Sequence, residues 1–284
     1  MYLQKYLFTC LGILLLACVA WAAPSEQPVS LSTKDGWNLA AVYMPAVKNT
    51  TVILLHDLGK NKEEFSSFKK ALAKAGFGYL ALDLRGHGQS TGAGSYKAFA
   101  KEGPDNPFNK MLQDALAGIN FLKSKNISED HIILLGAGLG ANVAAKAAGA
   151  VPNLLGIALI SPSANIRDVL PVPALRSYKG AVLLAASADD RKGFLEASIL
   201  RNVAFLTAGA GNVTFLTAYD SSSHALLDKY LTYSVVQWVA TPYKPEVLPD
   251  APATVYTVLP TDTRGVEVTP SGTEQALIPS VLTQ

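Results

Sequence analysis

Short apolar runs, each bounded by glycine or polar residues, are the feature that most constrains how this chain can fold. They occupy residues 51–55, 79–82, 132–135, 154–160, 181–185 and 213–216. Runs of this length without polar alternation are typical of strands that are buried on both faces of a sheet. We therefore predict a buried strand at each of them.

Segments with a helical spacing of apolar residues separate these runs. Phe65, Phe68 and Leu72 recur at helical intervals, and Gly76 follows as a stop signal. Similar spacing predicts helices over 112–122, 141–148, 194–200 and 226–239. Gly149 is placed to end the helix over 141–148.

A predicted hairpin precedes the alternating part of the chain. Residues 29–32 and 39–43 flank the dipeptide Asp35-Gly36, which is a strong turn signal between apolar runs. Strands that alternate with helices after such a hairpin predict the α/β class. We expect a mostly parallel, doubly wound sheet with helices on both faces.

The N-terminal segment 1–22 differs from the predicted domain, which spans 24–240. Its one charge is Lys5, and it ends in Ala20-Trp21-Ala22, the pattern of a cleaved signal peptide. The stretch Leu15-Leu16-Ala17-Cys18 also fits a lipoprotein signal with a lipid on Cys18, and an uncleaved anchor is a third alternative. All three predict export to a bacterial periplasm or the extracellular space, with membrane contact only through this segment or the lipid.

The C-terminal extension 241–284 holds 7 of the 16 prolines and shows no helical or strand period. This composition favours a flexible extension. The short apolar stretch over 255–258 leaves open an added edge strand or a docking segment.

Charge and cysteine content exclude several function classes. The chain has 24 Lys and Arg against 22 Asp and Glu, which argues against nucleic acid as a partner. Both cysteines, Cys10 and Cys18, lie in the N-terminal segment, so the mature domain has no cysteine nucleophile, disulfide or cysteine metal site. With four histidines and no H-E-x-x-H spacing, we expect no metal and no other cofactor.

Polar motifs follow the predicted strands directly. They are His56 to Gly59, Asp83 to Ser90, Gly136 to Ala141, Ser187 to Asp190, and Ser222-Ser223-His224. Because ligands of open α/β sheets bind at the carboxyl ends of the strands, we expect these motifs to surround the functional site.

These motifs, in this order, resemble those of α/β-hydrolases, in particular dienelactone hydrolases and serine aminopeptidase-like esterases. In the resembled proteins a His-Gly-x-Gly turn supplies one oxyanion N–H, and the matching turn here is His56 to Gly59. The resemblance thus implies that the backbone N–H groups of Leu58 and Leu139 line an oxyanion hole, with Leu139 directly after the nucleophile position. It implies an acid at Asp189 or Asp190 and a histidine at His224.

The sequence departs from this family at the nucleophile. The elbow motif reads Gly136-Ala137-Gly138-Leu139-Gly140, so glycine stands where the family has its serine. Without a side chain, Gly138 cannot form an acyl-enzyme ester. Glycine does adopt the strained backbone of such an elbow at no steric cost, so the fold should be unharmed.

Three hypotheses on function follow. The first is a catalytically degenerate homologue that acts as a binding or scaffolding protein. The second is a weak or unconventional ester or peptide hydrolase that uses His224 with Asp189 or Asp190 and water or a relocated serine. The third is nucleotide binding through Gly136 to Ala141, although the next strand ends without the carboxylate which that motif needs.

The segment 164–180 is too short for a lid domain and contains two prolines. We therefore expect an open, shallow cleft. Its ligand would be a small ester, acyl compound or peptide, and the sequence names no protein partner.

Overall fold

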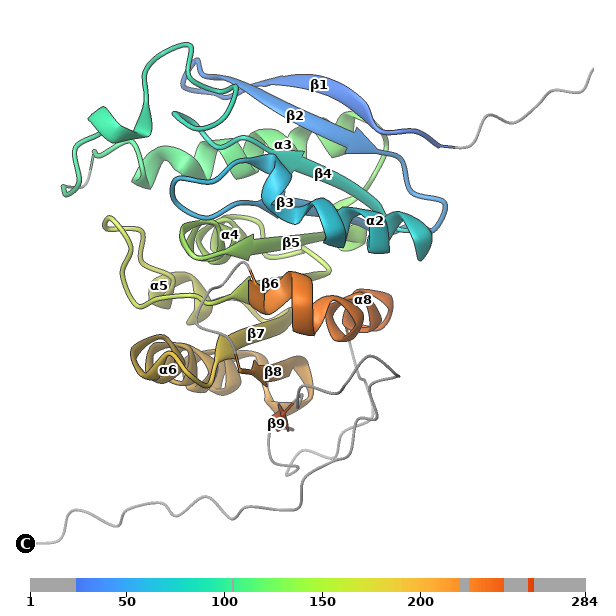
Figure 1. Cartoon of the computed structure of the whole chain (residues 1–284), viewed down its shortest axis with the longest axis vertical. Coiled ribbons are helices and arrows are strands. Elements are labelled where there is room, and N and C mark those ends of the chain that lie inside the picture. Colours follow the sequence, from blue (N-terminus) through green and yellow to red (C-terminus); the bar gives the residue numbers. More distant parts are fainter. Residues whose placement is uncertain (1–23, 104, 220–224, 243–254, 258–284) are drawn as a thin grey trace, which may run out of the picture.

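A nine-stranded sheet forms the centre of the molecule (Figure 1). The computed structural model describes residues 24–103, 105–219, 225–242 and 255–257. The strand order is β1-β2-β4-β3-β5-β6-β7-β8-β9. Strands β1 (Gln27–Ser32) and β2 (Asn38–Met44) pair in antiparallel fashion, and β2 also runs antiparallel to β4 (Gly78–Leu82). The remaining strands are parallel: β3 (Thr51–Leu55), β5 (Ile132–Ala137), β6 (Gly156–Ile160), β7 (Ala181–Ser187), β8 (Val213–Ala218) and β9 (Val255–Thr257).

Helices cover the sheet on both faces. The helices α3 (Leu112–Ser124), α4 (Leu139–Ala150), α5 (Val172–Leu175) and α6 (Arg191–Ala208) pack on one face. On the opposite face lie η1 (Lys62–Phe65), α2 (Ser66–Lys74), the π-helical turn η6 (Leu226–Leu231) and α8 (Thr232–Ala240). Shorter 3₁₀ turns are η2 (Tyr96–Ala98), η3 (Asn109–Met111), η4 (Glu129–His131) and η5 (Ala210–Asn212).

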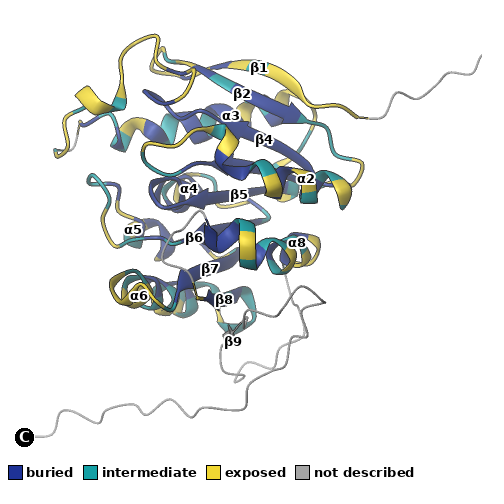
Figure 2. Ribbon diagram, viewed as in Figure 1, coloured by how far each residue is buried: buried dark blue, intermediate teal, exposed yellow. Residues whose placement is uncertain are grey.

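The central strands are buried along their whole length, and Figure 2 shows them dark beneath the helices. Successive side chains of a strand serve opposite faces, so that Leu55 packs toward α3 and α4 while Leu54 packs toward α2. This double burial explains why the strands appear in the sequence as continuous apolar runs. The prediction of a doubly wound, mostly parallel α/β sheet is confirmed.

Two details differ from the sequence-based expectation. Gly149 does not end its helix, because α4 continues to Ala150 and stops before Pro152. A Cβ atom at Gly149 would lie 2.8 Å from the Cβ of Ala174, so this glycine allows α4 to pack closely on α5. The helix predicted over 226–239 begins as a π-helical turn and becomes α-helical at Thr232.

The C-terminal extension contributes β9, which pairs in parallel with β8. The edge strand that the sequence left open is therefore present at Val255–Thr257, and the rest of the extension beyond residue 242 lies outside the described residues. The N-terminal segment 1–22, including Cys10 and Cys18, also lies outside them. None of the described helices is both long enough and apolar enough to cross a membrane.

The connection between β6 and β7 carries only α5, so no lid domain is inserted in this described segment. The buried side chain of Asn142 in α4 holds the connection in place. Its Nδ2 donates to the carbonyl oxygens of Ser163 and Val169, at 2.9 and 2.8 Å, and its Oδ1 accepts from the N–H of Ser163 at 3.2 Å. The β6–β7 connection therefore places no inserted domain over the carboxyl ends of the strands, as far as the described residues show.

Candidate functional site

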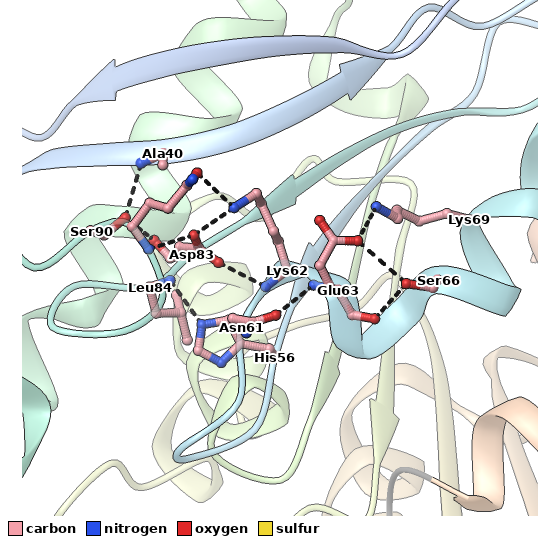
Figure 3. Close-up of polar contacts among 11 residues, drawn as sticks. Ala40, His56, Asn61, Lys62, Glu63, Ser66, Lys69, Asp83, Leu84 and Ser90 are labelled. Carbon is pink, nitrogen blue, oxygen red and sulfur yellow. Dashed lines mark hydrogen bonds and ion pairs between the residues drawn. The ribbon is translucent and has the colours of Figure 1, made fainter.

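The motif from Asp83 to Ser90 fastens the loop after β4 to its neighbours (Figure 3). The buried carboxylate of Asp83 accepts hydrogen bonds from the backbone N–H and the Nζ of Lys62, both at 2.8 Å, and from the N–H of Gln89 at 2.8 Å. The hydroxyl of Ser90 donates to the carbonyl of Asp83 and accepts from the N–H of Ala40. This part of the motif is structural.

Arg85 has a similar structural role. Its guanidinium is buried and forms ion pairs with Asp114 in α3 and with Asp35 in the β1–β2 turn, both at 2.6 Å. It also lies over the ring of Trp37. Arg85 therefore connects the hairpin, the loop after β4 and α3 beside the site.

His56 and His87 shape the loops from within. The Nδ1 of His56 donates to the carbonyl of Asp57 at 2.7 Å, and its Nε2 accepts from the N–H of Leu84 at 3.0 Å, so the ring is neutral with the proton on Nδ1. Burial lowers the pKa of His56 to about 4 and also lowers that of His87. Within the described ranges no group of three potential ligand side chains is placed to hold a metal ion.

Gly138 stands between β5 and α4 in the conformation of a sharp strand-to-helix elbow, with φ 49° and ψ −113°. Few residues other than glycine adopt this backbone, which confirms the expectation of a strained elbow. Its neighbours Gly136 and Gly140 allow a close backbone approach. A Cβ atom at Gly140 would lie 2.5 Å from the carbonyl carbon of Leu55 in β3. These two glycines serve the packing of α4 against the sheet.

The side chain that fills the elbow comes from the loop after β3. A Cβ atom at Gly138 would lie 2.5 Å from Oδ2 of Asp57, and closer still to its Oδ1 and Cγ. The Oδ1 of Asp57 accepts hydrogen bonds from the N–H of Leu58 at 2.6 Å and from the N–H of Leu139 at 2.9 Å. A carboxylate therefore lies at the nucleophile position and binds both N–H groups that the sequence assigned to an oxyanion hole.

Glu64 supports the loop that carries Asp57. Its Oε2 accepts the backbone N–H of Asp57 at 2.7 Å. Burial raises the pKa of Glu64 to about 7, with a further contribution from the charge of Asp57, while the N–H bond opposes the shift. A buried carboxyl group whose pKa is raised thus lies beside Asp57.

The two candidate acids, Asp189 and Asp190, have different surroundings in the structure. Asp190 caps α6, since its side chain accepts the N–H of Gly193 at 3.0 Å. Asp189 is exposed at the end of β7, and its backbone N–H donates to the hydroxyl of Ser187 at 3.2 Å. His224 lies outside the described residues, so its place relative to either acid stays a prediction.

Comparison with protein families gives a match over residues 47–201, more than half of the chain, to the family described as Serine aminopeptidase, S33. The chain belongs to this family. A comparison with curated protein sequences gave no match.

Solved α/β-hydrolase structures resemble this serine aminopeptidase family member in fold. An esterase from Pyrococcus furiosus is 18% identical with a TM-score of 0.64, covering 78% of this chain and 92% of its own. Dienelactone hydrolase from Anabaena variabilis is 15% identical with a TM-score of 0.62, covering 78% and 100%. A 2,6-dihydroxy-pseudo-oxynicotine hydrolase is 14% identical with a TM-score of 0.64, covering 81% and 72%. At these identities the similarity shows the fold alone.

Sequence reasoning missed Asp57 as a site residue of this α/β-hydrolase-fold protein. A signal for it exists in the motif from His56 to Gly59, which reads His-Asp-Leu-Gly where the family pattern is His-Gly-x-Gly. A carboxylate replaces glycine in this motif, and glycine replaces serine at Gly138. The two departures become related only when the fold brings the loop after β3 against the elbow.

Proposed function

We propose that this chain is an exported α/β-hydrolase-fold protein that has lost serine-dependent ester hydrolysis and acts as a binding or scaffolding protein. The observation that carries the proposal is the position of the Asp57 carboxylate, which lies where the side chain of a nucleophile would begin. The described β6–β7 connection carries no lid domain, and the open cleft expected at the strand ends would take a small acyl or peptide ligand.

Two physical reasons support the loss of acyl transfer. Position 138 offers no side chain to attack a carbonyl carbon. The N–H groups of Leu58 and Leu139, which would have to stabilise the negative oxygen of a tetrahedral intermediate, already bind Asp57. Both the nucleophile and its electrostatic support are thus missing from the same place.

Asp57 also argues against nucleotide binding at Gly136 to Ala141. A phosphate bound there would accept hydrogen bonds from the N-terminal end of α4. In this chain the carboxylate of Asp57 already accepts the N–H of Leu139 at that end and would repel a phosphate.

The test uses the purified mature chain with a fluorophosphonate probe and p-nitrophenyl acetate, and an active serine esterase as the positive control. We expect neither probe labelling nor ester turnover above the rate in buffer. Labelling of any serine that disappears in His224→Ala would instead support the second hypothesis, a relocated serine. Incubation with short N-acyl peptides should raise the melting temperature without cleavage by mass spectrometry.

Export is tested separately. Residues 1–30 fused to an alkaline phosphatase that is active only outside the cytoplasm should give active enzyme in a bacterial host. The mass of the mature N-terminus then distinguishes cleavage after Ala22 from lipidation at Cys18, and Cys18→Ser should change the product only in the second case. An inactive fusion would remove the export part of the proposal.

A further inference from the structure

The two N–H groups at the elbow form a built anion site, because they come from different elements and converge on one atom. Leu58 lies in the loop after β3, and Leu139 is the first residue of α4. Both donate to Oδ1 of Asp57, at 2.6 and 2.9 Å. Two donors on one carboxylate oxygen are the arrangement that stabilises a bound anion.

The backbone of Asp57 is fixed on both sides, so the carboxylate is placed by the loop. Its N–H donates to the buried Glu64, and its carbonyl accepts the Nδ1 proton of the buried His56. The ring of His56 is held in turn by the N–H of Leu84. Each contact comes from a buried group, which means that the loop cannot shift without breaking several hydrogen bonds.

The charge of the site also suits a carboxylate. The N-terminus of α4, a helix of 12 residues, carries a partial positive charge directed at Asp57. Gly138 leaves the space in front of Leu139 without a side chain, and Asp57 fills that space. The carboxylate is thus bound as a ligand would be.

We propose that the N–H groups of Leu58 and Leu139 form a carboxylate-binding pocket and that the side chain of Asp57 is its resident ligand. The inference rests on the proposed loss of acyl transfer and explains how the site remains closed. Small carboxylates, such as formate and acetate, are the class that would enter the pocket once Asp57 is removed. In the natural chain the attached carboxylate has a much higher local concentration than a free one and keeps the pocket occupied.

The proposal makes residues 57 and 138 interdependent. A serine at position 138 needs the space of the Asp57 carboxylate, whereas glycine at position 57 would leave that space empty. Asp57→Gly restores the His-Gly-x-Gly pattern of the family, so the loop should tolerate it. Asp57→Asn is the matched control, because its amide oxygen can still accept both N–H groups.

The first experiment measures the melting temperature of the full mature chain against formate and acetate, with chloride at equal ionic strength as the reference. Asp57→Gly should gain a saturable increase with both carboxylates, as linkage requires for a ligand that binds the folded state. The natural chain and Asp57→Asn should show no more than the chloride effect. Asp57→Ala provides a second opened variant in case the glycine variant does not fold.

The second experiment is a double-mutant cycle with Gly138→Ser. The serine should lower the melting temperature more in the natural chain than in Asp57→Gly. Equal decreases in melting temperature in the two backgrounds would overturn the proposal. It would also be overturned if Asp57→Gly and Asp57→Ala responded to formate and acetate no more than to chloride. Fluorophosphonate labelling of the natural chain would instead overturn the proposed function, so the two failures are distinguishable.

Discussion

The carboxylate of Asp57 lies where the side chain of any residue larger than glycine at position 138 would begin. The distance from a Cβ atom at Gly138 to Oδ2 of Asp57 would be 2.5 Å, whereas Cβ atoms essentially never lie within 3.0 Å of a non-bonded heavy atom of another residue. Glycine at the elbow is therefore required by its neighbour as well as by its positive φ. The two departures from the family pattern form one structural unit.

Replacing Gly138 with alanine should destabilise the protein by about 3–5 kcal/mol. The residue would adopt a strained backbone, which costs about 1–3 kcal/mol, and would displace a carboxylate that makes two charge-assisted hydrogen bonds. Chemical denaturation measures the change in the free energy of unfolding.

Two other glycines provide matched controls for this measurement. Gly209 has φ 84° but open space around its Cβ position, so Gly209→Ala should show the backbone cost alone. Gly92 has open space and no positive φ, and Gly92→Ala should change stability by less than about 0.5 kcal/mol. Equal losses for Gly138→Ala and Gly209→Ala would show that Asp57 moves aside freely.

Glu64 should make the folded state less stable as pH rises from about 4.5 to 7. Its pKa in the folded protein is raised to about 7 from the usual 4.5, so the folded state holds the proton that the unfolded chain releases. The linkage predicts a loss of up to about 3 kcal/mol across this range. Because His56 contributes in the opposite direction over part of this range, the loss is measured by chemical denaturation as the change with pH in the difference between the natural chain and Glu64→Gln, which can still accept the N–H of Asp57. The exposed neighbour Glu63 serves as the control, and a Glu63→Gln profile that differs from the natural one would contradict the assignment.

The strand pattern was predictable because burial on both faces leaves a local signal. The apolar run 51–55 matches β3 residue for residue, and the Asp35-Gly36 hairpin places β1 and β2 correctly. The end of α4 was not predictable from Gly149, because this glycine is needed for the close packing of α4 on Ala174 and not for ending the helix. No local signal marked the π-helical turn over Leu226–Leu231 either.

The sequence predicted only part of the candidate site. The missing serine at Gly138 is local information, and so are the two N–H donors that follow from the motif. The role of Asp57 is not local, because one carboxylate after a strand is usually solvated, and only the parallel pairing of β3 with β5 brings it to the elbow. Asp190 caps α6 by accepting the N–H of Gly193. The spacing of the sequence could not distinguish this role from that of its neighbour Asp189.

Breaking the ion pair between Arg85 and Asp114 should be strongly destabilising. The side chains are 1% and 0% exposed, and Asp114 accepts from both the guanidinium and the backbone N–H of Arg85. Asp114→Asn leaves a buried charge with one carboxylate partner fewer, which costs about 3–5 kcal/mol in comparable cases. The exposed pair of Lys123 and Glu129 is the control, and Glu129→Gln should lower the free energy of unfolding by less than about 1 kcal/mol. Similar losses for the two substitutions would contradict the buried arrangement.

His56 should limit stability on the acid side. Its pKa in the folded protein is lowered to about 4 from the usual 6.5, so the unfolded chain binds a proton that the folded state excludes. The contribution of His56 to the free energy of unfolding should therefore fall as pH decreases from about 6.5 to 4, by up to about 3 kcal/mol. His56→Asn keeps a donor for the carbonyl of Asp57 but removes the titrating ring, so the difference between the natural chain and this variant should shrink toward low pH. At neutral pH the variant should be less stable by about 1–3 kcal/mol, because the N–H of Leu84 loses its acceptor.

The surface residue His131 is the control for this prediction. If His131→Asn weakened the pH dependence of the free energy of unfolding as much as His56→Asn does, the acid dependence would not come from the buried ring.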